Sequence, residues 1–445
     1  MGKPLPIVDT PVEIVDLAHD GRGVGRLDGK AVFVAGALPG ERVRLGRRRR
    51  RGGIEEAELA EVLEPAPDRV QPPCAHFGLC GGCALQHLAP AAQLAAKDRE
   101  LQAQLERLGR VTPEERLAPL AGPAWEYRRR ARLGVKYVAK KERVLVGFRE
   151  RESPYVTDVR RCHVLVPPVG GLLEPLGDLV GGLAIRDRIP QIEVAVADGA
   201  ARPRVVLVVR VLDAPGADDV ARLRAFAAER GVEFWLQPGG LETAAPLDPA
   251  ASPGGPLTDR LPAFDLTLEF GPLDFVQVNA ALNARMVEHA LAWLAAEPGH
   301  AVLDLYCGIG NFTLPIARRA GRVLGVEGEA GLVSRARANA AANAISNAEF
   351  AVADLSADLR GEPWARARFD RVLLDPPRVG AREVLPLVAA SGAKRVVYIS
   401  CHPGSLARDA GLLVHEHGFR LRAAGVMDMF PHTAHVESIA VFERT

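Results

Sequence analysis

Ala301-Val-Leu-Asp-Leu-Tyr-Cys-Gly-Ile-Gly-Asn-Phe312 sets the architecture of the C-terminal part of this 445-residue chain. An apolar strand pattern runs into a turn with glycines at 308 and 310, and a helical pattern follows. Such a turn lets the backbone come close to a nucleotide-like cofactor, because glycine has no side chain in the way. The stretch therefore predicts the first strand and helix of an open α/β sheet, with a cofactor at the carboxyl end of the strand.

Buried apolar runs recur along the rest of the C-terminal part and alternate with segments of helical period. The runs that predict parallel strands are Ala301–Leu305, Arg322–Val326, Asp370–Leu374 and Arg395–Ile399. Strands that alternate with helices build a doubly wound, Rossmann-like α/β sheet, whose strand tips open into one crevice. We therefore predict a Rossmann-like domain over residues 264–445.

Acidic side chains stand near the tips of the predicted strands. Glu327 follows the glycine turn by about 20 residues, a spacing at which a carboxylate binds ribose hydroxyls. Asp354 ends a further strand-like run, where it could accept a hydrogen bond from an adenine amino group, and Asp375 opens the motif Asp-Pro-Pro-Arg. A dinucleotide dehydrogenase would carry a third glycine where Phe312-Thr313 stands. The pattern therefore favours S-adenosylmethionine over a dinucleotide.

A thiol follows the last predicted strand, in Ser400-Cys401-His402-Pro403, and so lies at the edge of the cofactor crevice. One methylation that requires a thiol there is that of uracil at C5, because C5 becomes nucleophilic only after a thiolate has added to C6. The adduct must then lose its C5 proton to a general base, for which Glu437 is the candidate. His432 and His435 are alternatives, as the base or as metal ligands.

Short alternating runs separated by glycine-rich turns fill residues 7 to 63. The runs are Val12–Leu17, Ala31–Val34, Arg42–Leu45 and Glu58–Leu63. They predict a small antiparallel barrel that ends near Pro65. Seven arginines lie within ten positions of this barrel, at 42, 44 and 47 to 51. Because such a cluster repels itself unless a polyanion neutralises it, we expect the barrel to bind RNA; the alternative is a solvated surface loop.

Four of the six cysteines form a candidate metal site. They are Cys74, Cys80, Cys83 and Cys162. In a reducing compartment they are better explained as ligands than as disulfides, and four thiolates suit a zinc ion or an iron–sulfur cluster. One triplet and a distant single cysteine favour the cluster. We therefore predict a central domain over residues 66–263, with a helix at 90–110 that can pack on the C-terminal domain.

Neither an export signal nor a membrane span is indicated, because the chain has no uninterrupted apolar run of about 18 residues. We predict a cytoplasmic protein with no membrane partner.

Four segments together resemble motifs of the bacterial RNA uracil-C5 methyltransferases. They are Asp304–Phe312, Asp375–Arg378, Ser400–Pro403 and Asp428–Glu437. Phe275–Asn279 is also similar to the segment that precedes the first Rossmann strand in that family. The resemblance implies that the cofactor and substrate pocket is lined by Gln277, Tyr306, Asn311, Glu327, Asp354 and Asp375. It also implies Cys401 as the nucleophile and Glu437 as the base.

The resemblance covers nearly the whole chain and implies a multidomain α/β protein. The barrel at 1–65 resembles a TRAM domain, an OB-like module found in the branch that methylates a uridine of 23S ribosomal RNA. The family carries a [4Fe-4S] cluster on positions that match the four cysteines, so an iron–sulfur-containing central domain is implied. A Rossmann-like domain that uses S-adenosylmethionine then completes the chain. We expect a monomer whose partner is 23S ribosomal RNA.

Two positions depart from the family pattern, which usually has asparagine in place of His402 and often a single proline in place of Pro376-Pro377. Both departures leave the thiol and the carboxylate unchanged. A uridine of tRNA is the alternative substrate. Two other functions stay open, an amino-group methyltransferase of nucleic acid, which would need no thiol, and a non-enzymatic RNA-binding factor that keeps the cofactor domain as a scaffold.

Overall fold

The computed structural model describes residues 3–5, 9–198, 203–249 and 255–444, and these form two compact units. The first unit consists of Met1–Glu100, Phe148–Thr157 and Phe430–His435. The second consists of Leu101–Gly147, Asp158–Met429 and Val436–Thr445. Both units therefore combine segments that are far apart in the sequence. The division into consecutive domains at residues 65 and 263 stays a prediction.

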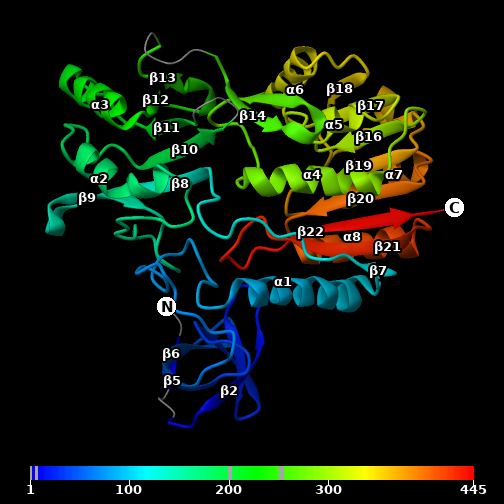
Figure 1. The fold of residues 1–445 in the computed structure, drawn as a ribbon. Helices are drawn as coiled ribbons and strands as arrows, with labels where there is room; N and C mark the ends of the chain where they lie inside the picture. Colours follow the sequence, from blue (N-terminus) through cyan, green and yellow to red (C-terminus); the bar gives the residue numbers. More distant parts are fainter. Residues whose placement is uncertain (1–2, 6–8, 199–202, 250–254, 445) are drawn as a thin grey trace. The chain divides into compact units, whose positions relative to one another are not determined.

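A closed β-barrel forms the core of the first unit, shown in blue in Figure 1. Its strands are β1 (Lys3–Leu5), β2 (Val12–Leu17), β3 (Gly23–Leu27), β4 (Lys30–Ala35), β5 (Arg42–Arg51) and β6 (Ile54–Glu64). They follow the order β1-β5-β2-β3-β4-β6, and a further pairing of β5 with β6 closes the ring. Closure leaves few unpaired strand edges, and alternate residues of each strand fill the interior. Val12, Ile14, Val32, Val34 and Val43 are buried there, which confirms the barrel predicted from the alternating runs.

A mixed sheet of six strands forms one part of the second unit, in the order β13-β12-β11-β10-β8-β9. The strands are β8 (Arg130–Val138), β9 (Arg143–Gly147), β10 (Gln191–Ala197), β11 (Arg204–Arg210), β12 (Glu233–Gln237) and β13 (Ala245–Pro246). Neighbours pair antiparallel except β11 and β12, which are parallel and connected by helix α3 (Ala217–Arg230). A parallel pair needs such a crossover, because a hairpin turn joins only antiparallel strands.

An eight-stranded sheet forms the other part of the second unit, in the order β18-β17-β16-β19-β20-β22-β21-β7. Its strands are β7 (Glu115–Arg116), β16 (Ala301–Leu305), β17 (Arg322–Glu327), β18 (Ala348–Val352), β19 (Arg371–Leu374), β20 (Arg395–Ser400), β21 (Arg420–Met427) and β22 (Glu437–Glu443). The five strands from β18 to β20 are parallel, whereas β22 lies antiparallel between β20 and β21. The Rossmann-like sheet is therefore confirmed, with a reversed last strand that the periodicity did not predict.

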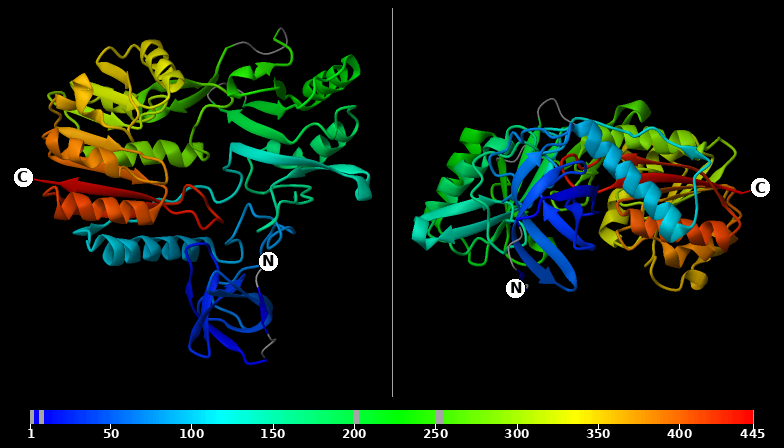
Figure 2. Two further views of the ribbon diagram at one scale, coloured as in Figure 1. Left: turned by 180° about the vertical axis from the view of Figure 1, so that it is seen from behind. Right: turned by 90° about the horizontal axis from the view of Figure 1, so that it is seen from below.

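Helices flank this sheet, as Figures 1 and 2 show. The longer ones are α4 (Ala280–Leu294), α6 (Ala330–Ala342) and α8 (Pro403–His415), and the short α5 (Thr313–Ala317) follows the glycine turn. Figure 2 shows from behind how α8 runs beside the antiparallel strand β22. Strand residues such as Val302, Leu303, Val396 and Val397 have no exposed surface, because a sheet covered by helices buries both faces.

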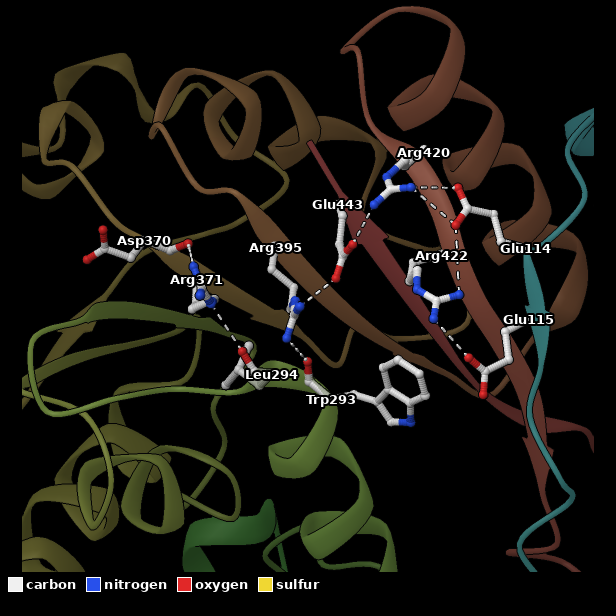
Figure 3. A network of polar contacts seen from close by, with 10 residues as sticks. All are labelled: Glu114, Glu115, Trp293, Leu294, Asp370, Arg371, Arg395, Arg420, Arg422 and Glu443. Atoms are coloured by element: carbon white, nitrogen blue, oxygen red, sulfur yellow. Dashed lines mark hydrogen bonds and ion pairs between the residues drawn. The ribbon is translucent and has the colours of Figure 1, made fainter. Parts of the chain in front are cut away.

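A network of hydrogen bonds and ion pairs lies at the end of the sheet that is remote from the glycine turn (Figure 3). Arg371 and Arg395 donate to the carbonyls of Leu294 and Trp293, at 3.2 and 3.0 Å. These carbonyls end helix α4 and carry the negative end of its dipole, so the two guanidinium groups satisfy them and stabilise the helix end. Arg395 also pairs with Glu443 at 2.5 Å, and Arg420 bridges Glu443 and Glu114, each at 3.0 Å. The network thereby fastens the chain next to β7 to the sheet.

The predicted iron–sulfur-containing central domain is wrong. Within the described ranges, no group of three or more His, Cys, Asp or Glu side chains is arranged to hold a metal ion. The sequence argument treated the four cysteines as one group because of their number and spacing, which do not fix where each side chain lies in the folded chain. The Cys80 sulfur accepts a hydrogen bond from the backbone amide of Gly82 at 3.4 Å, and burial raises the pKa of the Cys80 thiol.

Of the helices in the described part of the chain, none has both the length and the apolar character of a membrane span.

Candidate active site

The glycine turn after β16 has a backbone that few residue types can adopt. Tyr306, Gly308 and Gly310 have φ angles of 66°, 54° and 95°, in the left-handed region that favours glycine. The amides of Tyr306 and Cys307 donate to the carbonyl of Val326 at 2.9 and 3.1 Å, which ties the turn to β17. The turn therefore opens at the carboxyl end of the parallel strands, as the sequence predicts.

Glu327 ends β17 and lies against this turn. Its carboxylate accepts from the amide of Gly308 at 3.1 Å and from the amides of Gly328 and Glu329 at 2.7 and 3.2 Å. These bonds fix the carboxylate at the mouth of the glycine turn. Because a carboxylate has about four lone-pair sites, capacity remains for hydroxyl donors of a ligand.

Asn311, in the glycine turn, is held by a side chain of helix α4. The side-chain amides of Asn311 and Asn283 donate to each other at 3.0 and 2.9 Å. Asn279 starts that helix, since its side chain accepts from the amide of Leu282 at 3.1 Å. This pair of amides links the glycine turn to α4, so a shift of the helix would move the turn as well.

Gln277 lies just before α4, and its backbone is held by a buried arginine. Arg129, with 2% exposed surface, donates to the carbonyl of Gln277 at 2.9 Å and pairs with Asp259 of β14 (Leu257–Leu261) at 2.6 Å. The Arg129 amide also donates to the carbonyl of Val278 at 2.9 Å. A planar guanidinium suits this task, because it donates in several fixed directions at once.

The remaining predicted acidic residues have different surroundings. Asp354 lies two positions beyond β18 and is exposed, and hydrogen bonds from Ser356 lower the pKa of its carboxyl. Asp375 directly follows β19 and is half-buried, and burial raises its pKa to about 7.

Asp304 was missed as a site residue by the sequence reasoning, which included it in the motif Asp304–Phe312 but gave it no role of its own. Its side chain has no exposed surface, and it accepts from the hydroxyl of Thr313 at 2.5 Å. Burial raises its pKa to about 8, and the carboxylates of Asp375 and Glu327 add to the rise. An aspartate inside an otherwise apolar strand was the available signal, since a buried acid needs a specific reason.

Cys401 and Glu437 lie on neighbouring strand ends in the second unit. Cys401 directly follows β20 and is half-buried, whereas Glu437 begins β22 and has 4% exposed surface. Burial raises the pKa of the Cys401 thiol to about 11; Glu437 and Asp375 add to the rise and Arg378 opposes it. Burial and the charge of Asp375 also raise the pKa of Glu437 well above its usual value. The structure thus brings together the thiol, the carboxylate and Asp375.

His402, at one of the departures from the family pattern, caps the helix that follows Cys401. Its Nδ1 accepts from the amide of Ser405 at 3.1 Å, at the first turn of α8. An asparagine side chain makes the same kind of cap, so either residue can serve this purpose. His432 and His435, the alternative bases, belong to the first unit.

Most arginines of strand β5 are paired within the barrel. Glutamates of β6 lie opposite them, and Arg42, Arg44 and Arg49 pair with Glu64, Glu61 and Glu56 at 3.2, 2.6 and 2.7 Å. Arg48 pairs with Glu55. The argument that a polyanion must neutralise this cluster is therefore wrong, because the neighbouring strand supplies the opposite charges.

Two family models match this chain. One, described as tRNA (Uracil-5-)-methyltransferase, matches residues 265–445, and the TRAM domain model matches residues 10–45. A crystal structure of Pyrococcus abyssi tRNA (uracil-54, C5)-methyltransferase in complex with S-adenosyl-L-homocysteine has a TM-score of 0.74, with 97% of this chain and 100% of that chain covered. At 23% identity this likeness concerns the fold. The predicted N-terminal TRAM barrel and C-terminal methyltransferase fold are confirmed.

Relatives of higher identity extend over the full chain. A protein of Alkalilimnicola ehrlichii named 23S rRNA (uracil(1939)-C(5))-methyltransferase RlmD is 54% identical over 99% of this chain and 98% of its own length. Proteins of the same name from Xanthomonas oryzae and Methylococcus capsulatus are 52% and 50% identical, over 97% and 99% of this chain and 96% and 98% of their own lengths. With identity this high over nearly complete chains, the protein belongs to the RlmD family of 23S rRNA (uracil-C5)-methyltransferases.

Proposed function

We propose that this protein transfers a methyl group from S-adenosylmethionine to C5 of a uridine in 23S ribosomal RNA. The observation that carries the proposal is the closeness of Cys401, which directly follows β20, to Glu437, which begins the neighbouring strand β22, at the carboxyl ends of the parallel strands where the glycine turn also lies. The printed names of the full-length relatives support the same reaction and the same RNA. An amino-group methyltransferase would need neither the thiol nor the buried base.

The residues at the strand tips fit S-adenosylmethionine. A β-carbon added at Gly308 would meet no atom of the described residues within 4 Å, so the turn leaves space there for a ligand, and the carboxylate of Glu327 is fixed beside it for ribose hydroxyls. The residues that we propose to line the pocket are Gln277, Tyr306, Asn311, Glu327, Asp354 and Asp375. When bound, this cofactor supplies an electrophilic methyl group.

Cys401 opens the reaction by adding its thiolate to C6 of the uracil. The new S–C6 bond pushes electrons through the ring to C5 and O4, so that C5 becomes the nucleophile that takes the methyl group. Burial raises the pKa of the Cys401 thiol to about 11, which disfavours the thiolate at neutral pH. The guanidinium of Arg378 favours the ionised form, which gives this cation a part in making the thiol reactive.

Glu437 completes the reaction as the base. After methylation C5 carries both the methyl group and a proton; the carboxylate takes this proton, the electrons re-form the C5–C6 double bond and the S–C6 bond breaks. Burial raises the pKa of Glu437, which makes its carboxylate a stronger base than that of an exposed glutamate. The Cys401 thiolate is released unchanged, so the enzyme is regenerated.

The target uridine has to leave its stack to reach Cys401, at a cost of a few kcal/mol that RNA contacts offset. We propose that the TRAM barrel supplies part of these contacts. A cytoplasmic location and a monomeric state complete the proposal and stay predictions.

Mapping of 5-methyluridine in total RNA would test the substrate. A strain that lacks this gene should lose one 5-methyluridine from 23S ribosomal RNA, and wild-type protein but not a Cys401→Ala variant should restore it. Loss of a tRNA 5-methyluridine instead would favour the tRNA alternative. Methylation restored by the Cys401→Ala variant would rule out the proposed reaction.

A further inference from the structure

The loop after β19 carries two of the charges that act on Cys401. It runs from Asp375 through Pro376, Pro377, Arg378 and Val379 to Gly380. The amide of Gly380 donates to the carbonyl of Pro377 at 2.8 Å and closes the turn, with a φ angle of 89° at the glycine. The proline side chains leave the loop few hydrogen bonds of its own, because proline has no N–H group to donate.

Side chains of helix α8 hold this loop at consecutive points. The hydroxyl of Ser405 lies 3.0 Å from the carbonyl of Arg378, and Arg408 donates to the carbonyl of Val379 at 2.8 Å. The carboxylate of Asp409 accepts from the amide of Ala381 at 2.7 Å. The backbone around Arg378 is thus fixed from one helix face.

Asp409 also bonds to the strand that presents the thiol. The same oxygen that accepts from Ala381 accepts from the hydroxyl of Tyr398 at 2.7 Å, and the other oxygen accepts from Arg408 at 2.8 Å. Tyr398 lies in β20, three positions before Cys401, and both Tyr398 and Asp409 have no exposed surface. One buried carboxylate therefore joins the loop, the strand and the helix.

We propose that Asp409 is a positioning residue, which fixes the loop bearing Asp375 and Arg378 against the strand end that presents Cys401. The inference rests on the proposed function, because it assigns Asp409 to the alignment of the reacting thiol. Asp409 touches neither the thiol nor the uracil in this scheme, and its effect passes through Ala381 and Tyr398.

The packing around Gly380 shows how closely the loop after β19 lies against helix α8. A β-carbon at this position would lie 2.6 Å from the Asp409 carboxylate and 2.5 Å from the Arg408 guanidinium. A side chain at this position would therefore push the Arg408 and Asp409 side chains away from the loop, and the positive φ angle of 89° also favours glycine there.

A released loop would alter the chemistry as well as the stability. Three charged groups act on Cys401, namely Asp375 and Arg378 of this loop and Glu437 of β22. Asp375 raises the pKa of the Cys401 thiol and Arg378 lowers it, so any movement of the loop changes the net electrostatic effect on that pKa. An effect on the pH dependence of Cys401 is therefore expected from Asp409 variants, and a purely structural role would not produce it.

The test compares Asp409→Ala and Asp409→Asn with Asp370→Ala. Asp370 is a matched control, because its carboxylate also accepts a backbone amide, that of Ala301 at 2.8 Å, but at the remote end of the same sheet. Three quantities are measured for each full-length variant: kcat and KM for RNA, the rate of covalent adduct formation with 5-fluorouridine RNA, and the pH profile of Cys401 alkylation without RNA.

We expect Asp409→Ala to lower kcat and the rate of adduct formation by about tenfold or more, because misplacement by about 1 Å can cost up to a hundredfold. KM should change less, the alkylation profile should shift, and Asp370→Ala should stay near wild type. Asparagine at 409 should recover part of the rate, since its amide oxygen can still accept from Ala381 and Tyr398.

Adduct formation at the wild-type rate in Asp409→Ala, with an unchanged alkylation profile, would overturn the positioning role. If the alanine variant does not fold, Asp409→Asn and Tyr398→Phe take its place, and wild-type adduct rates in both would also overturn it. Failure of the wild-type protein to form any adduct would count against the proposed function instead, and the alkylation profile, which needs no RNA, would still test Asp409.

Discussion

Cys401 and Glu437 occupy the next register positions beyond the pair formed by Ser400 of β20 and Ser438 of β22. Directly opposed residues of antiparallel strands project to the same face and have β-carbons about 5 Å apart. The hydroxyl of Ser438 donates to the carbonyl of Ser400 at 3.1 Å and holds the two strand ends together. The proposed nucleophile and base are therefore set by the register of one strand pair, although 36 positions separate them in the sequence.

The first prediction concerns the thiol. Cys401→Ala should abolish methylation and the formation of a denaturation-resistant conjugate with 5-fluorouridine RNA, because no other group on the second unit is proposed to add to C6. Gel shift under denaturing conditions detects the conjugate. Cys307→Ala is the matched control, since this buried thiol lies in the glycine turn and should leave the conjugate intact. A conjugate formed by Cys401→Ala would refute the assignment.

The second prediction separates the base from the nucleophile. Glu437→Gln keeps the size of the side chain but cannot take the C5 proton, so methylated adduct should accumulate on ordinary uridine RNA while turnover falls by at least about a hundredfold. Mass spectrometry of the digested conjugate would identify the methyl group on the bound uridine. Normal turnover in this variant would show that another residue is the general base.

The third prediction concerns the ionisation of Cys401. In the free protein its alkylation rate should rise about tenfold per pH unit until the pKa near 11 is reached, because only the thiolate reacts. Glu437→Gln should lower this pKa by removing a nearby negative charge, and Arg378→Ala should raise it by removing a positive one. Peptide mapping after timed alkylation would measure both shifts. Shifts of the opposite sign would contradict the described electrostatics.

The fourth prediction follows from Asp304, whose pKa is raised to about 8 in the folded protein. A raised pKa means that the folded state holds its proton more tightly than the unfolded state. The stabilisation is therefore full below the usual pKa of 3.8 and is lost as pH rises towards 8. The largest slope for one proton is about 1.4 kcal/mol per pH unit. Asp304→Asn should remove this part of the pH dependence, as urea unfolding between about pH 5 and pH 8 would show.

The fifth prediction concerns Arg129 and Asp259. Arg129→Met should destabilise the protein by about 3–5 kcal/mol, because it leaves a buried aspartate without its partner. The affinity for S-adenosylmethionine should also fall, since the carbonyl of Gln277 loses its donor. The double variant Arg129→Met, Asp259→Leu should recover stability but not cofactor affinity, as denaturant unfolding and calorimetry would measure. Recovery of both would show that Arg129 has no part in placing Gln277.

Sequence reasoning identified the parts of the fold whose apolar residues follow a clear pattern along the chain. The parallel strand β16 was predicted at its observed bounds, and β17, β19 and β20 within one residue, because buried parallel strands are continuous apolar runs with charged ends. It could not find β22, whose position between β20 and β21 depends on a pairing across the sheet. The role of Asp409 was hidden for the same reason, since its partners Ala381 and Tyr398 become neighbours only in the folded chain.

Charge and cysteine patterns were less reliable guides than strand patterns. The arginines of β5 looked unpaired because the matching glutamates come between 7 and 22 residues later, on β6, and only the antiparallel register aligns them. The four cysteines looked like one ligand set because spacing along the chain does not fix where each side chain lies in the folded protein. Asp304 was overlooked because a single acid in a strand does not change the apolar pattern around it.

Strand β22 contributes its first residue to the proposed chemistry and the rest to the sheet, where it is the neighbour of both β20 and β21. A chain shortened before Glu437 would therefore lose the proposed base and, in the same step, the strand that connects β21 and β7 to the parallel part of the sheet.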